Sequence, residues 1–333
     1  MKIRKLCIKN ICGLPDMDVN LTDRSGQPFD VVLFTGPMGC GKTRLLEAIA
    51  AWKEIAGSYG TKVGGTFLPR DPKQPAVIEG TWHVSSNEIT FGALSDANIQ
   101  VAVDIFERKA LSDVPTGLRK VLSAFERTNT VGKVEYFPAS RQIYSGPLPV
   151  PIHAVSEKLD ASLRLTKDPE KYGLERAWLT SELASDLSTM TTSLEERGIV
   201  LPGQVIDSLT HFKRSFARLA PHLRLSGLSS VGEKSAPTFV RSDRTSVLID
   251  ELSSGEQQAV LFAATFERLG LSNSLLLIDS PELFISAGEQ MRFFQTLTRL
   301  GQDNQVIGAT SSTAIVNQVP AEQVVELGAI QPR

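Results

Sequence analysis

The sequence is poor in the residues that build disulfide scaffolds and metal clusters. Its 333 residues include three cysteines and four histidines. An odd number of cysteines argues against a disulfide framework, and Cys7, Cys12 and Cys40 lack the spacing of metal ligands. No apolar run reaches the roughly 18 residues that a membrane-spanning helix needs. We therefore expect no disulfide-rich secreted domain, no cysteine-based metal site and no membrane contact.

The sequence also lacks an excess of either charge, since its formal net charge is -2 at pH 7. This balance excludes a globally basic nucleic-acid binder and leaves room for a local basic patch. Hydrophobic residues make up 41% and charged residues 22% of the chain, as in soluble globular proteins. The N-terminus alternates cationic and apolar residues, which predicts a strand rather than a signal peptide. We expect a cytoplasmic protein.

What the sequence does contain is a succession of strand and helix patterns. Apolar runs and turn residues predict strands at 2–10, 17–22, 30–35, 76–84, 88–93, 98–106 and 133–137. Those at 76–84, 88–93 and 98–106 are expected to form an antiparallel meander. Helices are predicted from Lys42 onward, near 116–127 and through about 152–225. Beyond residue 237 strands and helices alternate at 245–249, 254–269, 274–279, 287–300, 305–309 and 324–327, which implies a mostly parallel, covered sheet.

A glycine-rich loop lies between the apolar strand at 30–35 and the helix that follows. It matches the pattern G-x-x-x-x-G-K-[ST] and comprises Gly36, Pro37, Met38, Gly39, Cys40, Gly41, Lys42 and Thr43, followed by Arg44. Glycines let successive backbone N–H groups turn toward phosphate oxygens, and the helix adds its positive end. Lys42 would neutralise the β- and γ-phosphates of ATP, and Thr43 would offer its hydroxyl to Mg²⁺. A glycine-rich turn that caps an ordinary helix is the alternative; the position after a buried strand favours this Walker A interpretation.

A second apolar segment, Ser274–Asp279, ends in a carboxylate and suits a Walker B strand. The aspartate of such a strand holds the magnesium shell, so Asp279 joins Thr43 as a predicted metal ligand. The alternative is a core strand with an acidic residue in its first loop position. The preceding Walker A loop favours the metal-binding interpretation.

The segment Leu252–Gln258 precedes this strand, with Ser253 26 residues upstream of Asp279. Ser253 and Glu256 fit a capping box, so a purely structural role is available. The segment also resembles the ABC signature, L-S-G-G-Q or L-S-x-G-E, through Ser253, Ser254, Gly255 and Glu256. The resemblance implies that the signature serine and glycine of one subunit close over the γ-phosphate held by the partner's Walker A loop. The bare N–H groups of a helix N-terminus suit that task.

Three further segments indicate which group of ABC-type ATPases the sequence resembles. The opening stretch Ile3–Leu14 looks like the start of SMC, RecF and OLD-type ATPases, where a strand and a "knF-G" stretch precede the P-loop. The string Asp279–Leu283 resembles the "DEPEL" of OLD-type and related AAA-labelled ATPases. Residues 136–142 resemble the "yfpa-R" segment of that group, which implies Gln142 as the Q-loop contact to nucleotide and metal. Arg141 is a rival contact for the γ-phosphate, and an ordinary loop is the alternative to both.

Two departures from this family pattern concern hydrolysis. The residue after the Walker B aspartate is normally a glutamate that polarises the attacking water, and here it is Ser280. The expected switch histidine is replaced by Ser311, and no histidine follows His222. Loss of a general base typically costs about 10²–10⁴ in rate, so the resemblance implies slow hydrolysis. Glu282, two residues beyond Ser280, is the candidate substitute, and it also fits an ordinary position of the family.

The resemblance covers roughly residues 1–145 and 237–329. It implies an α/β P-loop NTPase with an ABC-type head, a mixed and mostly parallel sheet with an antiparallel β subdomain, and a helical insert. Ser253 lies 211 residues after Lys42, which leaves room for the insert, and the Pro- and Gly-rich stretch 145–151 marks the exit from the first lobe. We predict a first ATPase lobe with Walker A and the β subdomain at 1–150, the insert at 151–230, and a second lobe with signature and Walker B at 231–333.

The insert ends in an amphipathic helical pattern. One face carries His211, Arg214, Arg218 and His222, and the other carries Phe212, Phe216, Leu219 and Leu223. The apolar face is predicted to be core. The basic face is either a solvated surface or a docking site for DNA or an acidic partner, and DNA binding through phosphates would depend strongly on salt.

No second catalytic constellation is evident in the sequence. The resemblance therefore implies an ATP- and Mg²⁺-dependent switch: two copies, or a higher oligomer, hold ATP across a symmetric interface and control a separate effector. A nuclease or toxin in anti-phage defence or DNA maintenance would be such an effector. A transporter ATPase subunit is one alternative. It would have roughly one hundred residues between the Walker A loop and the signature, an acidic residue at position 280 and a histidine at position 311. The sequence has none of these features. A catalytically silent nucleotide-binding scaffold is the other.

Overall fold

The computed structural model describes residues 1–61, 67–126, 130–143, 156–197, 207–231 and 234–328. These residues form two compact units: unit 1 comprises 1–141, 156–168 and 270–333, and unit 2 comprises 142–155 and 169–269. The division differs from the predicted one, because residues 231–269 group with the segment 169–230 rather than with the chain's C-terminal part. The predicted exit from the first lobe at 145–151 lies outside the described residues. Among the described helices, none combines the length and hydrophobicity that a bilayer crossing requires.

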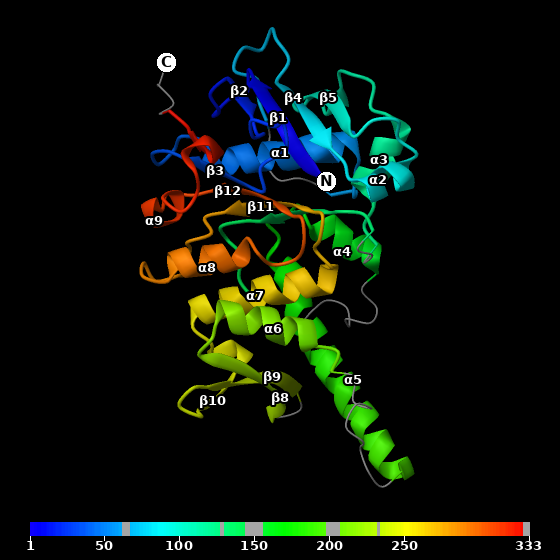
Figure 1. Ribbon diagram of the computed structural model, residues 1–333, viewed down its shortest axis with the longest axis vertical. Helices are drawn as coiled ribbons and strands as arrows, with labels where there is room; N and C mark the ends of the chain where they lie inside the picture. The colour runs from blue at the N-terminus through cyan, green and yellow to red at the C-terminus, as the bar shows by residue number, and fades with distance from the viewer. Residues whose placement is uncertain (62–66, 127–129, 144–155, 198–206, 232–233, 329–333) are drawn as a thin grey trace. The chain divides into compact units, whose positions relative to one another are not determined.

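Unit 1 contains a parallel sheet with the strand order β13-β3-β12-β11-β7. Figure 1 shows β3, β12 and β11 of this sheet. Its strands are β3 (Val31–Thr35), β7 (Val134–Phe137), β11 (Leu275–Asp279), β12 (Gln305–Ala309) and β13 (Val324–Glu326). Every residue of β7, β11 and β12 is buried, as expected of parallel strands covered on both faces. This confirms the mostly parallel, covered sheet that the sequence predicts. Because the strands run in one direction, β3, β11 and β12 all end at the same edge.

Unit 1 also contains an antiparallel sheet with the order β2-β1-β4-β5-β6. The strands are β1 (Lys2–Lys9), β2 (Met17–Asn20), β4 (Val77–His83), β5 (Asn98–Asp104) and β6 (Lys109–Ala110). The predicted strand at 88–93 is wrong, because this segment forms helix α2 (Ser86–Gly92). Ser85 caps the Glu88 N–H, and the Glu88 carboxylate accepts from the Ser85 N–H at 2.8 Å. This capping box starts a helix where the apolar pattern suggested a strand.

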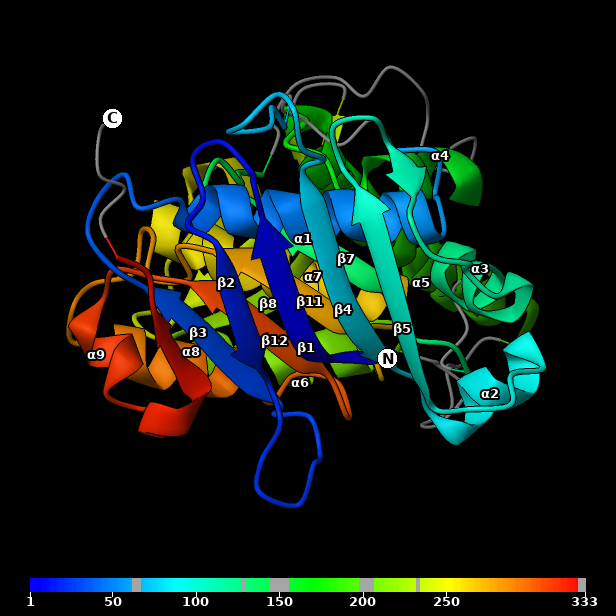
Figure 2. The same cartoon turned by 90° about the horizontal axis from the view of Figure 1, so that it is seen from above.

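Helix α1 (Lys42–Ala56) lies between the two sheets, as Figure 2 shows from above. It is buried on nearly all sides, including Leu46, Ile49 and Trp52, because both sheets pack against it. The Trp52 ring stacks on Trp82 of β4 with the ring centroids 4.6 Å apart. Further helices of unit 1 are α3 (Thr116–Ser123), α4 (Glu157–Leu163), α8 (Gln290–Leu297), α9 (Thr313–Val316) and the short η4 (Ala321–Gln323). The helix that follows the glycine-rich loop is therefore held rigidly in the core.

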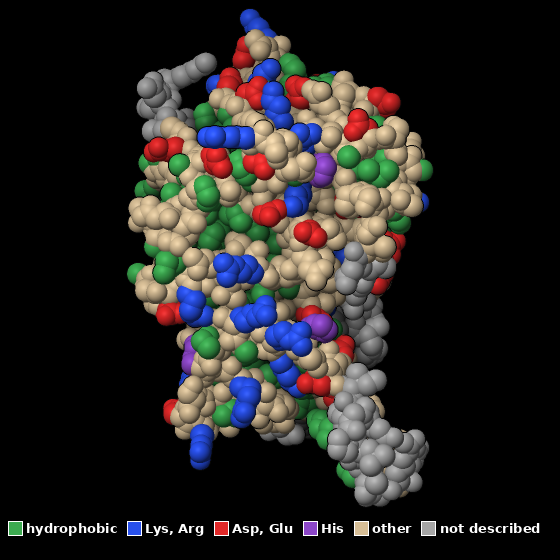
Figure 3. Space-filling view, viewed as in Figure 1, with side chains coloured by type: hydrophobic (Ala, Val, Ile, Leu, Met, Phe, Trp, Pro, Cys, Tyr) green, Lys and Arg blue, Asp and Glu red, His purple; other side chains and the backbone are tan. Residues whose placement is uncertain are grey.

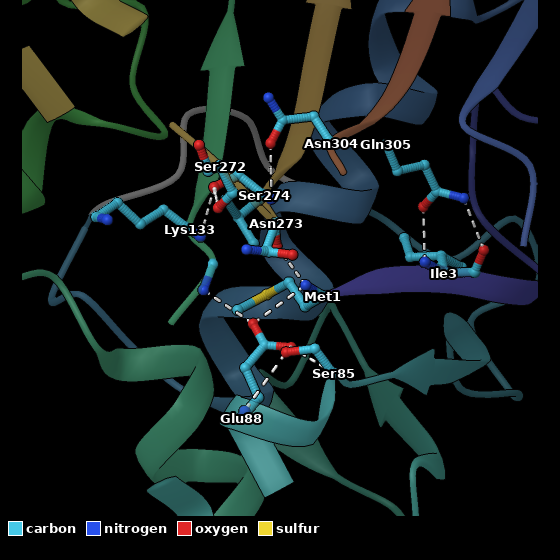
Figure 4. Close-up of polar contacts among 12 residues, drawn as sticks. Met1, Ile3, Ser85, Glu88, Lys133, Ser272, Asn273, Ser274, Asn304 and Gln305 are labelled. Atoms are coloured by element: carbon cyan, nitrogen blue, oxygen red, sulfur yellow. Dashed lines mark hydrogen bonds and ion pairs between the residues drawn. The ribbon is translucent and has the colours of Figure 1, made fainter. Parts of the chain in front are cut away.

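A cluster of buried polar contacts joins the two sheets of unit 1 (Figure 4). The side chain of Gln305, at the start of β12, accepts from the Ile3 N–H at 2.6 Å and donates to the Ile3 carbonyl at 3.0 Å. It also donates to the Phe29 carbonyl at 2.8 Å. Glu88 accepts from the Gly132 N–H at 2.9 Å and from the Met1 amino group at 3.1 Å. Side chains therefore provide the polar partners where the edges of the two sheets approach each other.

Unit 2 combines helices with a small antiparallel sheet of order β10-β9-β8. Its elements are η2 (Pro169–Tyr172), α5 (Gly173–Arg197), α6 (Thr210–Leu219), β8 (Leu223–Val231), β9 (Lys234–Arg241), β10 (Ser246–Leu248), η3 (Ile249–Glu251) and α7 (Ser254–Leu269). The hairpin of β8 and β9 was not predicted, and the expected helical region 152–225 ends at Leu219. Phe216 of α6 packs against Phe239 of β9 with ring centroids 5.4 Å apart. This contact confirms that the apolar face of α6 is core.

Candidate functional site

The loop between β3 and α1 has a backbone that only glycine accommodates at several positions. Gly36, Gly39 and Gly41 have φ angles of 145°, 81° and 95°. A Cβ atom would lie 2.4 Å from a backbone carbonyl oxygen at Gly36 and 2.5 Å from another at Gly41. Both the backbone conformation and the space therefore require glycine there. Helix α1 begins without a side-chain cap and without an acidic residue in its first turn, so its N–H groups suit an anion.

The Lys42 side chain folds back over this loop. Its ammonium donates to the carbonyl oxygens of Gly36 at 2.8 Å and Pro37 at 3.0 Å, and lies 3.7 Å from the Cys40 sulfur. The Cys40 side chain is buried, whereas Met38 is 99% exposed. The loop thus keeps a positive charge at its centre, as a phosphate cradle requires.

Asp279 at the end of β11 is the second part of the site. The Thr43 hydroxyl lies near enough to its carboxylate to favour the ionised form, while Oδ2 is buried and has no hydrogen-bond partner in the described part of the chain. Burial raises the pKa of Asp279, and the nearby Thr43 hydroxyl and Arg141 oppose this rise. A buried carboxylate oxygen without a partner, next to a threonine hydroxyl, fits a Mg²⁺ shell completed by water and phosphate. The structure therefore brings together Thr43 and Asp279, the two residues that the sequence predicts at the metal.

This fit does not require a metal cage made of protein side chains alone. No group of three or more His, Cys, Asp or Glu residues suited to a metal occurs within the residues described. Magnesium in phosphate-transfer sites is commonly held by one or two protein oxygens together with substrate phosphates. The donor set of Thr43 and Asp279 agrees with that arrangement.

The two positions that depart from the family pattern lie at neighbouring strand ends. Ser280 has a φ of 50°, an uncommon value for a non-glycine residue, and its N–H donates to Ala309 at 2.8 Å. The carboxylate of Glu282 accepts from the Thr310 hydroxyl at 2.8 Å and from the Ser311 N–H at 3.0 Å. Glu282 therefore ties the loop after β11 to the loop after β12. The carboxylate that the sequence suggests as a substitute base contacts the very position where a switch histidine was expected.

The remaining residues predicted to contact nucleotide or metal are Arg141, Gln142 and Arg44. Arg141 is buried and donates to the carbonyl oxygens of Pro138, Asp279 and Ser280, so it fixes the end of β11. Gln142 is exposed, and Arg44 donates to the Cys12 carbonyl at 2.8 Å. Nucleotide or metal contacts by Gln142 and Arg44 stay predictions. For Arg141, the bonds to three carbonyl oxygens give it a structural task at this edge of the sheet.

The signature segment lies in unit 2 and begins α7. The predicted capping box is confirmed: the Glu256 carboxylate accepts from the Ser253 N–H at 2.8 Å, and the Ser253 hydroxyl accepts from the Glu256 N–H at 3.3 Å. Glu256 also lies 3.1 Å from both Arg241 Nη2 and His222 Nε2. Burial alone would raise the pKa of Glu256, but these hydrogen bonds lower it to about 2. Ser253 and Ser254 are exposed and Gly255 is half-buried, so the start of α7 is accessible.

Sequence reasoning missed two charged residues near the Walker B aspartate. Glu47, on α1 one turn after Thr43, opposes ionisation of Asp279, and Lys167 favours it. These two side chains form an ion pair with each other. The spacing of four residues from Thr43 could have indicated Glu47, because such residues share one face of a helix. No local signal indicates Lys167, which comes from a distant part of the chain.

Comparisons with known proteins agree with this geometry. Residues 31–317 match the family described as "AAA domain, putative AbiEii toxin, Type IV TA system". A search of curated protein sequences finds no match. Among solved structures, the chain is similar to the SmcHead bound to the C-winged helix domain of ScpA, with a TM-score of 0.53 and 13% identity over 96% of this chain and 92% of that chain.

Two other SMC heads show weaker similarity. The SMC head domain from Thermotoga maritima gives a TM-score of 0.46 and 14% identity over 98% of this chain and 94% of that chain. The other is the Smc head domain with an extended coiled coil, bound to the C-terminal domain of ScpA derived from Pyrococcus furiosus. Its TM-score is 0.47, with 12% identity over 96% of this chain and 92% of that chain. The family match spans most of the chain, and the first likeness shows the fold. The chain therefore belongs to this AAA-domain ATPase family and has the ABC-type P-loop fold of an SMC head.

Proposed function

We propose that this protein binds Mg-ATP and acts as a slow, nucleotide-gated dimerising switch that controls a separate effector. The observation that carries the proposal is the meeting of Lys42, Thr43 and Asp279 at one edge of the parallel sheet. The Thr43 hydroxyl beside Asp279 and the buried, unpartnered Oδ2 of Asp279 support metal-assisted ATP binding. When bound, Mg²⁺ would supply positive charge against the phosphates.

Each residue of the loop has a defined task in this proposal. The backbone N–H groups around Gly39 and Gly41 and the start of α1 would hold phosphate oxygens. The Lys42 ammonium would exchange its bonds to the Gly36 and Pro37 carbonyl oxygens for bonds to phosphate. Asp279 would hold the metal shell through the oxygen that otherwise lacks a partner. The metal shell bound with ATP would thus give the buried carboxylate a partner in place of the water that it lost on folding.

Slow hydrolysis follows from the residues at the ends of β11 and β12. A serine at 280 cannot take a proton from the attacking water, and a serine at 311 cannot act as a switch histidine. The Glu282 carboxylate is engaged by Thr310 and Ser311, which favours a positioning role over that of a free base. Loss of general-base catalysis would lower the rate by about 10²–10⁴-fold.

Dimer closure would use the start of α7. Ser253 and Ser254 are exposed there, and the positive end of a 16-residue helix favours an anion. We infer that this end seals the γ-phosphate bound by a second copy, so that two equivalent sites form across a two-fold interface. Effector control is proposed because the family description names a toxin of a toxin–antitoxin system and the similar SMC head is bound to a partner protein.

Sedimentation of the protein with Mg²⁺ and a nonhydrolysable ATP analogue tests the switch. We expect the wild type to dimerise with the analogue and to stay monomeric without it. Lys42→Ala should abolish both binding and dimerisation, whereas Ser253→Arg should retain binding and lose dimerisation. Ser188→Arg, at an exposed serine of α5, is the matched control and should behave as wild type. A nucleotide-bound wild type that stays monomeric at all concentrations would contradict the proposal.

A silent scaffold is the second candidate, favoured by the serines at 280 and 311. The two functions differ in the consequence of Lys42→Ala, since a scaffold with a vestigial pocket would bind ATP no better than the variant. They also differ in turnover: we expect slow but measurable hydrolysis in the wild type and faster hydrolysis in Ser280→Glu. Brisk wild-type hydrolysis that Glu282→Gln leaves unchanged would show that this interpretation of position 280 is wrong.

A further inference from the structure

We propose that Lys167 binds the γ-phosphate of ATP and so lets the site distinguish ATP from ADP. The inference rests on the proposed function, because it concerns the same nucleotide site. Lys167 lies outside every motif that indicated that site in the sequence. It follows helix α4 and belongs to unit 1, as do Thr43 and Asp279.

The partner of Lys167 places its ammonium group beside the predicted metal ligands. Lys167 forms an ion pair with Glu47, whose side chain is only 11% exposed. Glu47 lies four residues after Thr43 on α1, so both side chains leave the same face of the helix. Burial raises the pKa of Asp279, and Arg141 and Lys167 both lower it, so Lys167 is close enough to act on that carboxylate. The charge of Lys167 therefore reaches the place where Thr43 and Asp279 would hold a metal and its phosphates.

The surroundings of Lys167 differ from those of an ordinary surface lysine. Figure 3 shows Lys and Arg side chains at many places on one face of the molecule, so an exposed cation alone does not indicate a ligand. The carboxylate that Lys167 contacts is nearly buried, and it lies one helical turn from the threonine that follows the P-loop lysine. Lys167 thus extends from the surface toward the nucleotide site.

Lys167 has the freedom and the donors that phosphate binding needs. Its side chain is 46% exposed, whereas Arg141 is 1% exposed and donates to three carbonyl oxygens. A lysine ammonium carries three N–H donors on a flexible four-carbon stem. Lys167 can therefore keep one bond to Glu47 and direct another to a phosphate oxygen. Of the two cations that act on Asp279, Lys167 is the one that can serve a ligand.

The charges of the site explain why the γ-phosphate would need this cation. Asp279 and Glu47 bring two carboxylates to the place where the phosphates would lie, and like charges repel each other. The P-loop supplies Lys42, and position 311, where the family resemblance implies a histidine, is a serine. Lys167 would offset the repulsion at the γ-phosphate through a charge-assisted hydrogen bond. ADP lacks this phosphate, so the contact adds affinity for ATP alone.

Calorimetric titration of the full chain with Mg²⁺ and either ADP or the nonhydrolysable analogue adenylyl imidodiphosphate tests the inference. Lys167→Met should weaken binding of the analogue about tenfold, because a charge-assisted hydrogen bond is lost, and should change ADP binding less than about twofold. Lys167→Arg should recover part of the affinity for the analogue, because the charge returns. Lys158→Met removes an exposed lysine of α4 and is the matched control, which should bind both nucleotides as wild type.

A double variant separates phosphate binding from mere neutralisation of Glu47. If Lys167 only compensated the Glu47 carboxylate, Glu47→Gln combined with Lys167→Met would bind the analogue as tightly as wild type. We expect this double variant to bind the analogue about tenfold more weakly than Glu47→Gln alone, and to bind ADP equally well. The double variant leaves no unpaired carboxylate, so it keeps the test valid if Lys167→Met by itself is unstable.

Failure of this inference differs from failure of the proposed function. A wild type that binds neither nucleotide would refute the proposed function and this inference with it. A wild type that binds both, with the same ratio of analogue to ADP affinity in Lys167→Met and in wild type, would overturn this inference alone. Recovery of wild-type affinity for the analogue in the double variant would overturn it in favour of a purely structural ion pair.

Discussion

Replacement of Asp279 by asparagine should separate the stability of the fold from its affinity for Mg-ATP. Asp279 is buried, burial raises its pKa, and its Oδ2 makes no hydrogen bond to any described residue. The buried, ionised carboxylate therefore destabilises the folded state, and a neutral amide of the same shape destabilises it less. Without nucleotide we expect the variant to be at least as stable as the wild type.

The size of the effect follows from the burial of this oxygen. An unsatisfied buried polar group costs about 1–3 kcal/mol, and more when it is charged. Asparagine keeps an oxygen for the Thr43 hydroxyl but places an unpartnered N–H₂ group at the Oδ2 position, so only part of this cost is recovered. We expect a gain of about 1 kcal/mol in the free energy of unfolding, or about 2–4 °C in Tm for a unit of this size. Mg-ATP at one hundred times its Kd would stabilise the wild type by about 2.7 kcal/mol and the variant by far less.

Thermal unfolding with and without Mg-ATP measures both effects. The pKa of Asp279 is higher in the folded than in the unfolded state, so its destabilising contribution is present above the folded pKa and disappears as the pH falls through it. The stability difference between variant and wild type should therefore shrink toward acidic pH. Asp113→Asn, which removes an exposed charge in the same unit, is the control. An Asp279→Asn protein that unfolds more easily than wild type without nucleotide, or that gains full stabilisation from Mg-ATP, would refute this reasoning.

Three other substitutions give independent predictions. Burial lowers the pKa of Lys53 from 10.5 to about 7, so between these pH values the unfolded state binds more protons than the folded state and the wild type should gain stability as the pH rises. Lys53→Met should lack this gain, which denaturant titrations at pH 7 and 9 measure. Glu256→Gln should lower the free energy of unfolding by about 1–3 kcal/mol at neutral pH, because it removes the carboxylate that Arg241 contacts. The pKa of Glu256 is lowered from 4.5 to about 2 in the folded state, so the wild-type advantage should persist above pH 4.5 and fade as the pH drops from 4.5 toward 2. Gly36→Ala should weaken ATP binding at least about tenfold and destabilise unit 1 by about 1–3 kcal/mol, since its Cβ would lie 2.4 Å from a carbonyl oxygen at a φ of 145°. Calorimetry against Gly288→Ala, where nothing lies within 4 Å of the added Cβ, checks the last prediction; equal behaviour of the two variants would contradict it.

The sequence by itself determined the features that depend on near neighbours. A strand, a glycine-rich loop and a helix at 30–56 follow from residue type and spacing, because positive φ angles and helix N-termini are local properties. The capping box of Ser253 and Glu256 is also local, since its partners are three residues apart. The uninterrupted apolar run 275–278 indicated a covered parallel sheet for the same reason. These predictions needed only short-range geometry.

Only the tertiary structure decided which distant groups meet. The segment 88–93 alternates like a strand, yet its capping box makes it a helix that presents Glu88 to Gly132 and the N-terminus. Arg141 could have faced a phosphate, and the fold instead buries it against three carbonyl oxygens at the end of β11. The bonds from Thr310 and Ser311 to Glu282 likewise depend on the pairing of β11 with β12.

The physical reason is that burial and strand order are collective properties. The Asp279 carboxylate loses its water because β7 and β12 flank β11 in the sheet and α1 packs against it, and no local pattern records that loss. Strand order also sets which loops share an edge, and so places Thr43 beside Asp279 across more than two hundred residues of sequence. Residue types thus determine which chemistry is available, and the packing of the sheet determines where a charge remains buried and ready for a ligand.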